Sequence, residues 1–230
     1  MMTIFDNIKL PKILLEVHSD FNGKIIVAEA GHTRKLIVDG VKQSINWDSP
    51  ATAQKYWGRT VDVLKENQPA LKKVLVLGLG GGTIQHLISH AFPGVEIVSI
   101  EIDPEIVKVA KEYFDVDKIP NHRIILEDAF RVIVEPESHE LHEHYFDAIV
   151  IDIFAGEKFP DLGKSGNFIA ALKKMAIPDG LIVFNRIYLQ SHQDDVNLFI
   201  DSIQNFLTNV QSTVIAGATN SDNVLIYGRA

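Results

Sequence analysis

The amino-acid sequence predicts an α/β fold: a seven-stranded, mostly parallel sheet that ends in an antiparallel hairpin and follows a small N-terminal β unit. From Lys72 onward, short apolar runs alternate with segments of helical periodicity, an order typical of a parallel sheet with helices on both faces. A dense run of glycines follows the first apolar run of this series. Between residues 10 and 45, three further apolar runs are separated by turn residues, which is typical of antiparallel strands.

The composition is that of a globular protein: the chain has 230 residues, of which 46% are hydrophobic and 23% charged. It lacks an apolar run of the roughly 20 residues that span a membrane, and residues 1–12 lack the basic start and apolar core of a signal peptide. We therefore expect a cytoplasmic protein without a membrane partner. The lack of cysteine excludes disulfides, thiolate catalysis and cysteine-ligated metals. The net charge of −8 argues against a nucleic-acid partner and favours a small neutral or cationic substrate.

The N-terminal β unit, residues 1–48, is expected to contain three strands. They are Ile13–Val17, Lys24–Ala28 and Lys35–Asp39. A helix should follow this unit, because Asp48 or Ser49 can cap a first turn in which Pro50 is tolerated. We expect this helix to run to about Glu66.

The main domain, residues 49–230, should alternate strands and helices. The expected strands are Val74–Gly78, Glu96–Ile100, Arg123–Leu126, Phe146–Asp152, Gly180–Phe184, Thr213–Ala216 and Asn223–Gly228. The expected helices are Thr83–Ala91, Pro104–Tyr113, Ala129–Val134, Gly166–Met175 and Gln193–Leu207. Only a short turn, Thr219 to Ser221, separates the last two strands, so we expect them to form an antiparallel hairpin.

The glycine run lies where the first strand of the main domain ends. Lys73–Leu77 leads directly into Gly78, Leu79, Gly80, Gly81, Gly82 and Thr83, and a helical pattern follows. Glycines there allow a sharp turn and let a ligand approach the free N–H groups of the next helix. We therefore take Gly78, Gly80 and Gly82 as cofactor-binding candidates, although such a run is also compatible with tight packing alone.

A carboxylate follows the next strand at the spacing of nucleotide-binding folds. Glu101 comes about 20 residues after the glycines, where a side chain can accept hydrogen bonds from both ribose hydroxyls. The alternative for Glu101 is a solvated loop carboxylate. Asp103 precedes Pro104 and is better explained as the cap of the following helix.

The third and fourth strands also end in polar or small residues. Asp128 and Ala129 suit the edge and face of an adenine ring, and Asp152 follows a buried apolar strand. Because the carboxyl ends of parallel strands meet at one sheet edge, these positions together predict a Rossmann-like nucleotide site. An NAD site is disfavoured, because Thr83 interrupts the G-x-G-x-x-G pattern and a second βαβ half is missing.

These strand ends, together with Asp39-Gly40-Val41-Lys42-Gln43, resemble the spermidine and spermine synthase family from about Lys24 to Gly228. The resemblance implies a class I methyltransferase-like fold, S-adenosylmethionine or its decarboxylated form as cofactor, and possible homodimers. It implies that Gln43, Glu101, Asp128 and Ala129 contact the nucleoside. It implies that Asp152 faces a small-molecule acceptor and helps to deprotonate the attacking nitrogen.

Three positions depart from the family pattern. Gly81 replaces the Asp that grips the aminopropyl amine, Thr52-Ala53-Gln54 replaces a Tyr-His-Glu-like acceptor segment, and Ala155 replaces a second Asp in the loop after Asp152. A bound diamine is positively charged, and burying each charge without a partner costs several kcal/mol. These departures should therefore ruin polyamine binding.

The leading hypothesis is therefore methyl transfer from S-adenosylmethionine to an unidentified small acceptor, with Asp152 as general base or as the group that orients the acceptor. Asp152 could instead merely hold the cofactor or cap the next loop. A second hypothesis is an aminopropyltransferase whose acceptor carboxylates come from Glu157 or Asp161. A third is a non-catalytic nucleoside-binding or scaffold protein.

Other residues carry weaker signals. Tyr56 and Trp57 could line an acceptor pocket, but an aromatic pair on a helix is more often part of the core. His86 and His90 are four residues apart, yet Leu87 stands where a metalloprotease has Glu, so we expect surface histidines. We predict no metal site.

Overall fold

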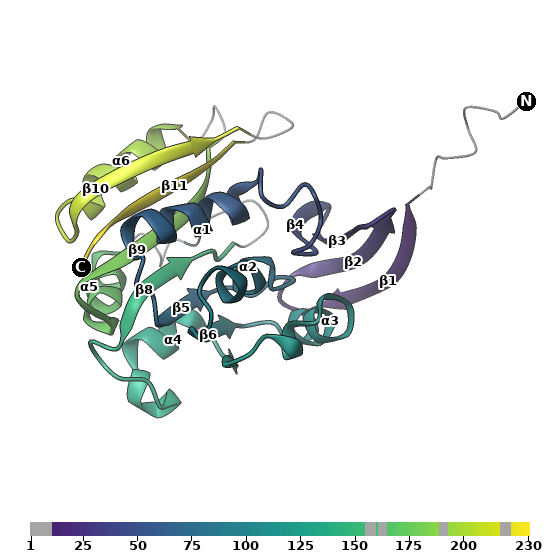
Figure 1. The fold of residues 1–230 in the computed structure, drawn as a ribbon, viewed down its shortest axis with the longest axis horizontal. Helices are drawn as coiled ribbons and strands as arrows, with labels where there is room; N and C mark the ends of the chain where they lie inside the picture. The colour runs from purple at the N-terminus through teal and green to yellow at the C-terminus, as the bar shows by residue number, and fades with distance from the viewer. Residues whose placement is uncertain (1–10, 155–159, 161–164, 189–192, 217–221) are drawn as a thin grey trace, which may run out of the picture.

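The main domain is built on a seven-stranded sheet, which the computed structural model describes within residues 11–154, 160, 165–188, 193–216 and 222–230. The strand order is β10-β11-β9-β8-β5-β6-β7 (Figure 1). The strands are β5 (Lys73–Leu77), β6 (Glu96–Glu101), β7 (His122–Leu126), β8 (Phe146–Ile151), β9 (Ala176–Tyr188), β10 (Thr208–Ile215) and β11 (Asp222–Arg229). Strands β5 to β9 are parallel, whereas β11 is antiparallel to β9 and to β10. The expected sheet and its terminal antiparallel pair are confirmed, although Thr219 to Ser221 lie outside the described residues.

Six α-helices and two short 3-10 helices are described. They are α1 (Tyr56–Asn67), α2 (Thr83–Ala91), α3 (Pro104–Phe114), η1 (Val116–Lys118), α4 (Ala129–Val134), η2 (Pro136–His139), α5 (Gly166–Met175) and α6 (Gln193–Ile203). Both faces of the sheet are covered, as β5 illustrates. Val74 and Val76 pack with α1 and α2, whereas Leu75 and Leu77 pack with α4, α5 and α6. This alternation explains why the central strands are continuous apolar runs.

A second, four-stranded antiparallel sheet precedes the main domain. It consists of β1 (Lys12–Ser19), β2 (Gly23–Ala30), β3 (Thr33–Val38) and β4 (Val41–Ile45), in that order. Figure 1 shows it beside α3, at the end of the molecule opposite β10 and β11. Leu36 and Val38 of this sheet share an apolar cluster with Ile106, Val109 and Phe114 of α3. The small sheet therefore packs on the main domain through a common core.

Asp103 joins the two sheets at the start of α3. Its Oδ1 accepts a hydrogen bond from the backbone N–H of Glu105 at 2.9 Å, so the expected helix cap is confirmed. Its Oδ2 accepts from Ser19 Oγ at 2.5 Å and from Asn22 Nδ2 at 2.7 Å, both in the turn between β1 and β2. One buried carboxylate thus caps a helix and anchors a hairpin.

Two sequence predictions about the region before β5 are wrong. The first helix begins at Tyr56 rather than near Pro50, because residues 48–55 form successive turns. Thr52 Oγ donates to the carbonyl oxygen of Asn46 at 3.0 Å, and Ser49 Oγ lies 2.9 Å from Thr33 Oγ. These side chains tie the segment to the small sheet instead of starting a helix. The small sheet also contains a fourth strand, β4, which we had not predicted.

The end of the chain differs from the prediction as well. Helix α6 ends at Ile203 instead of Leu207, and β10 begins at Thr208 instead of Thr213. Strand β9 begins directly after α5 and is interrupted by an irregularity in its pairing with β8. The apolar residues Phe206 and Leu207 extend the helical pattern in the sequence, but they pack against the core from the turn after the helix.

Within the described residues, no helix is both long enough and apolar enough to cross a membrane.

We predict that Asp103→Ala lowers the free energy of unfolding by at least about 2 kcal/mol, because it removes the cap of α3 and the acceptor for Ser19 and Asn22. Urea unfolding measures this change. The control is Glu112→Ala on the exposed face of α3, which should stay within about 0.5 kcal/mol of the wild type. Equal stability of the two variants would contradict the role of Asp103.

Candidate functional site

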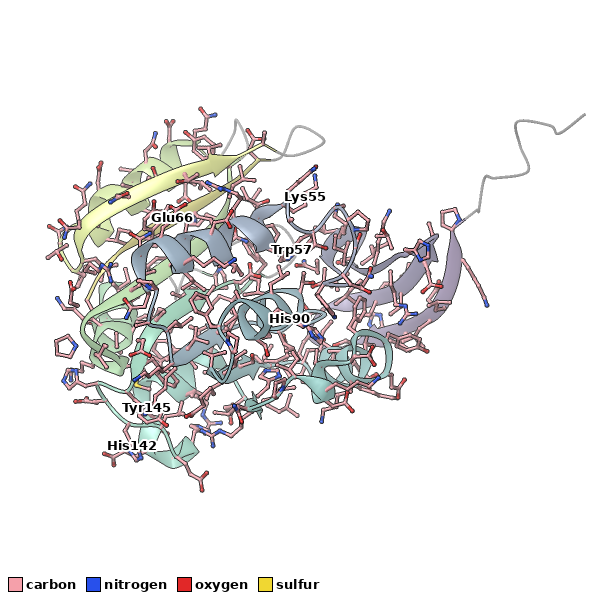
Figure 2. All side chains as sticks on the ribbon, in the orientation of Figure 1. Lys55, Trp57, Glu66, His90, His142 and Tyr145 are labelled. Carbon is pink, nitrogen blue, oxygen red and sulfur yellow. The ribbon has the colours of Figure 1, made fainter. Side chains whose placement is uncertain are left out.

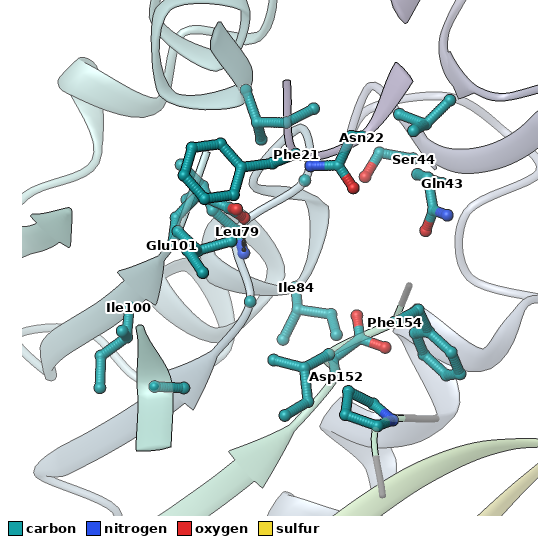
Figure 3. Close-up of a pocket in the computed structure, with 18 of the residues that line it drawn as sticks. Phe21, Asn22, Gln43, Ser44, Leu79, Ile84, Ile100, Glu101, Asp152 and Phe154 are labelled. Carbon is teal, nitrogen blue, oxygen red and sulfur yellow. Dashed lines mark hydrogen bonds between the residues drawn. The ribbon is translucent and has the colours of Figure 1, made fainter. Parts of the chain in front are cut away.

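A cavity of about 340 Å³ lies at the carboxyl ends of β5, β6, β7 and β8, beneath the small sheet (Figure 3). Strand ends of the main sheet provide Gly78, Gly80, Glu101, Asp128 and Asp152 to its wall. The small sheet provides Phe21, Asn22, Leu36, Val38, Gln43 and Ser44. Its volume falls in the range of small-molecule sites, about 300 to 1,000 Å³.

Most of the candidate residues meet in this cavity. Gln43, Gly78, Gly80, Glu101, Asp128, Ala129 and Asp152 all line it. Gly82 is absent from the lining: it has φ +70°, and a Cβ there would collide with Cγ1 of Val116. The structure thus gives Gly82 a packing role, in which only glycine fits against η1.

Gly78 fixes the approach of two central strands. It has φ +99°, and a Cβ on it would collide with the carbonyl oxygen of Asp152. The N–H of Asp152 in turn donates to the carbonyl oxygen of Leu77 at 2.9 Å. The glycine turn therefore brings the backbone after β5 directly against the backbone after β8, which sets the position of Asp152.

The small sheet is hydrogen-bonded to the glycine turn. Ser44 Oγ accepts from the N–H of Gly81 at 2.8 Å, and Thr83 Oγ1 donates to the carbonyl oxygen of Ile45 at 2.5 Å. Strand β4, which the sequence analysis missed, therefore forms one wall of the cavity. The turn between β1 and β2 forms another part, and its Phe21 is 57% exposed.

Glu101 is held rigidly at the end of β6. Its Oε1 accepts from the N–H of Asp103 at 3.0 Å and its Oε2 from the N–H of Leu79 at 3.1 Å. Burial raises the pKa of Glu101, and the hydrogen bonds from these backbone amides oppose the rise. Glu101 is thus a fixed, partly buried acceptor in the cavity wall and not a freely solvated loop carboxylate.

The neighbouring strand end provides two more carboxylates. Asp128 Oδ1 caps α4 by accepting from the N–H of Phe130 at 2.8 Å, and Glu127 Oε1 accepts from the N–H of Asp128 at 2.9 Å. Ala129 begins α4 and leaves room beside them. We call Glu101, Glu127, Asp128 and Ala129 the Glu101 side of the cavity.

Asp152 stands across the cavity from Glu101, beside Phe154 (Figure 3). Its Oδ1 accepts from Asn185 Nδ2 at 2.7 Å, and its Oδ2 accepts from the Tyr56 hydroxyl at 3.4 Å. Asn185 Oδ1 accepts in turn from Asn223 Nδ2 at 3.0 Å. We call Tyr56, Trp57, Asp152 and Phe154 the Asp152 side.

These surroundings change the acidity of the Asp152 side. Burial raises the pKa of Asp152 from its usual 3.8 to about 7, and the bonds from Asn185 and Tyr56 limit the rise. Burial and the nearby Asp152 raise the pKa of Tyr56 well above 10.0, so its hydroxyl stays protonated and donates. At neutral pH, Asp152 is poised to take up or release a proton.

Sequence reasoning missed two contributors, Asn185 and Asn22, and left open whether Tyr56 and Trp57 line a pocket or belong to the core. Tyr56 reaches Asp152, while the neighbouring Trp57 is 2% exposed and belongs both to the core and to the cavity wall. Asn185 is a polar residue at the end of the apolar run of β9, and this signal could have identified it. Asn22 reaches the cavity only because its hairpin folds onto Asp103, and local sequence spacing carries no such information.

The histidine prediction is wrong for His86. Its side chain is 6% exposed, its Nε2 lies 2.8 Å from the carbonyl oxygen of Phe114, and its ring stacks on Trp47. His90 is exposed, as expected, and also stacks on Trp47, with 4.0 Å between ring centroids. In the part of the chain that the structure describes, no three His, Asp or Glu side chains form a metal-binding group. Glu157, Asp161 and Ala155 fall outside that part.

Curated relatives include both methyltransferases and aminopropyltransferases. An eEF1A lysine and N-terminal methyltransferase homolog of Drosophila melanogaster is 30% identical over 124 residues, which is 50% of this chain and 18% of that protein. An N-terminal histidine N-methyltransferase of Emericella nidulans is 38% identical over 48% of this chain and 19% of its own length. A polyamine aminopropyltransferase of Vibrio vulnificus is 29% identical over 51% of this chain and 38% of its own length. The matches thus span well under half of these relatives.

Solved structures share the fold at low identity. A probable spermidine synthase from Corynebacterium glutamicum superposes with a TM-score of 0.76 and 17% identity, covering 95% of this chain and 80% of that one. Human methyltransferase-like protein 13 in complex with SAH gives a TM-score of 0.65 and 17% identity over 75% of this chain and 81% of that one. The spermine/spermidine synthase domain model matches residues 56–228. Because this match covers most of the chain, the protein belongs to the spermine/spermidine synthase family, within the class I methyltransferase-like fold.

Proposed function

We propose that this protein binds S-adenosylmethionine in the cavity and transfers its methyl group to a small acceptor held near Asp152. The observation that carries the proposal is the unequal charge of the two sides. The Glu101 side has three carboxylates, whereas Asp152 is the single carboxylate among the described residues of the Asp152 side. A nucleoside can donate hydrogen bonds from its hydroxyl and amino groups to the carboxylates of the Glu101 side. A diamine carries two positive charges and needs more than one anion, but the Asp152 side has a single carboxylate.

The Glu101 side fits a nucleoside. Glu101 is fixed by backbone amides and has lone pairs left for ribose hydroxyls, and Ala129 leaves space for a flat ring. Gly78 and Gly80 let a ligand approach the turn after β5. The family's members in the comparisons are methyltransferases and aminopropyltransferases, which supports an adenosyl donor of one of these two kinds.

The Asp152 side does not fit a polyamine. Thr52 is 1% exposed and hydrogen-bonded to the backbone of Asn46, so it is directed away from the cavity. A side chain at Gly81 would bring its Cβ to 3.0 Å from Ser44 Cβ and 3.1 Å from a ring carbon of Phe114. The position where the family resemblance implies an Asp is therefore tightly packed in this chain, and a side chain there would require Ser44 or Phe114 to shift.

The residues of the Asp152 side suit base catalysis. Bound S-adenosylmethionine supplies a methyl carbon that the acceptor's nucleophile attacks as the carbon–sulfur bond breaks. Asp152 accepts the proton that the nucleophile loses, since burial raises its pKa to about 7, where a carboxylate can take up a proton near neutral pH. Tyr56 and Asn185 hold the carboxylate in place, while Trp57 and Phe154 exclude water.

Aminopropyl transfer is the second candidate. A polyamine aminopropyltransferase of Chromobacterium violaceum is 25% identical over 70% of this chain and 61% of its own length. For this activity, carboxylates beyond those of the described residues would have to hold the diamine.

Calorimetric titration separates these functions. We predict that S-adenosylmethionine binds more tightly than its decarboxylated form, and that Glu101→Gln weakens methylthioadenosine binding at least about 10-fold, because charge-assisted bonds to the ribose are lost. Glu112→Gln, on the exposed face of α3, is the matched control and should bind as the wild type does.

If the protein forms spermidine from putrescine and decarboxylated S-adenosylmethionine at an ordinary enzymatic rate, the proposal of methyl transfer is wrong and aminopropyl transfer is the function. Failure of all three nucleosides to bind would instead favour a non-catalytic role.

Stability against pH tests the ionisation of Asp152. The folded protein keeps this proton up to a pH of about 7, whereas the unfolded chain releases it near 3.8, so wild-type stability falls as pH rises between these values. The Asp152→Asn variant has no carboxyl group at this position, so its stability does not fall for this reason as the pH rises. From about pH 5 to about pH 8, the variant should therefore gain on the order of 2 kcal/mol relative to the wild type.

Tyr56→Phe provides the second arm of this experiment. It removes a hydrogen bond that lowers the pKa of Asp152, so the loss of stability should extend to higher pH than in the wild type. A difference between wild type and Asp152→Asn that does not vary with pH would mean that Asp152 titrates like an ordinary surface carboxyl.

A further inference from the structure

Gln85 is a buried amide in the first turn of α2, at the wall of the cavity. The residue is 1% exposed, and it lines the cavity together with Thr83 and Ile84 of the same turn. Figure 3 shows Ile84 in this wall, and Figure 2 marks His90 near the opposite end of the helix. Helix α2 therefore begins at the cavity, so a bound ligand can reach both the Gln85 amide and the N-terminal end of the helix.

The hydrogen bonds of Gln85 fix the orientation of its amide. Its Nε2 donates to the carbonyl oxygen of Gly78 at 3.0 Å and to Ser99 Oγ at 3.1 Å. Because a carbonyl oxygen only accepts, the atom that faces Gly78 must be the nitrogen and not the oxygen. Oε1 has no partner among the residues that the structure describes, and it is not fully enclosed by protein. It is therefore an acceptor that a ligand in the cavity can use.

The N-terminal end of α2 adds a positive potential beside this acceptor. Gly82 precedes the helix and provides no side-chain cap, and the first turn contains no acidic residue. The backbone N–H groups of a first turn carry partial positive charge, which favours an anion and disfavours an isolated cation. An ammonium group bound to Gln85 would therefore be stabilised by a carboxylate that accompanies it.

The amino-acid end of S-adenosylmethionine has this combination of groups. Its ammonium can donate to the amide oxygen of Gln85, and its carboxylate provides both a counterion and an anion for the end of α2. Decarboxylated S-adenosylmethionine keeps the ammonium but lacks the carboxylate. A neutral amide cannot balance that charge, and Gly81 replaces the Asp that the family resemblance implies for gripping such an amine. Burying an unpaired ammonium costs several kcal/mol.

We propose that Gln85 Oε1 accepts a hydrogen bond from the ammonium of S-adenosylmethionine, and that this neutral contact selects the carboxylated donor over its decarboxylated form. The inference rests on the proposed function, and it names the residue that recognises the amino-acid end of the donor. Gln85 is a binding residue only, because no bond to it forms or breaks during the transfer.

The test compares S-adenosylmethionine with methylthioadenosine, which lacks the amino-acid end, by calorimetric titration of the full chain. Gln85→Met keeps the length of the side chain but removes the amide. We expect it to weaken S-adenosylmethionine about 10-fold, since a hydrogen bond to a charged group is lost, and to leave methylthioadenosine within about twofold of the wild type. Gln204→Met, at an exposed position after α6, is the matched control and should leave both affinities unchanged.

Gln85→Glu provides a second arm. A carboxylate at this position pairs with a lone ammonium and repels the carboxylate of S-adenosylmethionine. The ratio of affinities for S-adenosylmethionine and its decarboxylated form should therefore fall at least about 10-fold relative to the wild type. Because both ligands are titrated into the same variant, a general loss of affinity from a disturbed glycine turn cancels in this ratio.

Equal weakening of S-adenosylmethionine and methylthioadenosine by Gln85→Met would overturn the inference, because Gln85 would then only support the turn through Gly78. An unchanged affinity for S-adenosylmethionine in this variant would overturn it as well. Both results leave the proposed function in place as long as the wild type binds these nucleosides. If the wild type binds none of them, the proposed function and this inference are both wrong.

Discussion

The cavity depends on the attachment of the small sheet over the carboxyl edge of the main sheet. Asp103 provides the central contact, because one buried carboxylate accepts from Ser19, from Asn22 and from the first turn of α3. Ser44 adds a second contact through the N–H of Gly81. Without these bonds, the strand ends of the main sheet would form an open crevice, and Glu101 and Asp152 would face solvent instead of an enclosed space. Enclosure also makes both carboxyl groups weaker acids, since removal from water raises the pKa of Glu101 and of Asp152.

Local signals predicted the main sheet and the positions of its strand ends well, because a buried parallel strand and a glycine turn are encoded by neighbouring residues. Glu101, Asp128 and Asp152 reached one cavity because the order of parallel strands brings their ends together. Contacts between distant segments could not be predicted in this way. Tyr56 meets Asp152 across 96 positions of sequence, and Gly82 serves packing against Val116, although it belongs to the same motif as Gly78.

The distribution of carboxylates within the cavity is more informative about a ligand than the overall charge of the chain. A net charge of −8 favours neutral or cationic partners for the molecule as a whole. Within the cavity, however, the described residues place three carboxylates at the ends of β6 and β7 and one, Asp152, at the end of β8. The cavity therefore combines the fold of the family with an uneven distribution of carboxylates between its Glu101 side and its Asp152 side.

A crystal structure of the protein soaked with methylthioadenosine tests the central claim most directly. The account predicts a ribose whose hydroxyls lie within hydrogen-bond distance of Glu101, with the thioether pointing toward Asp152. Ligand bound elsewhere on the surface, or a cavity that side chains fill in the soaked crystal, would contradict it.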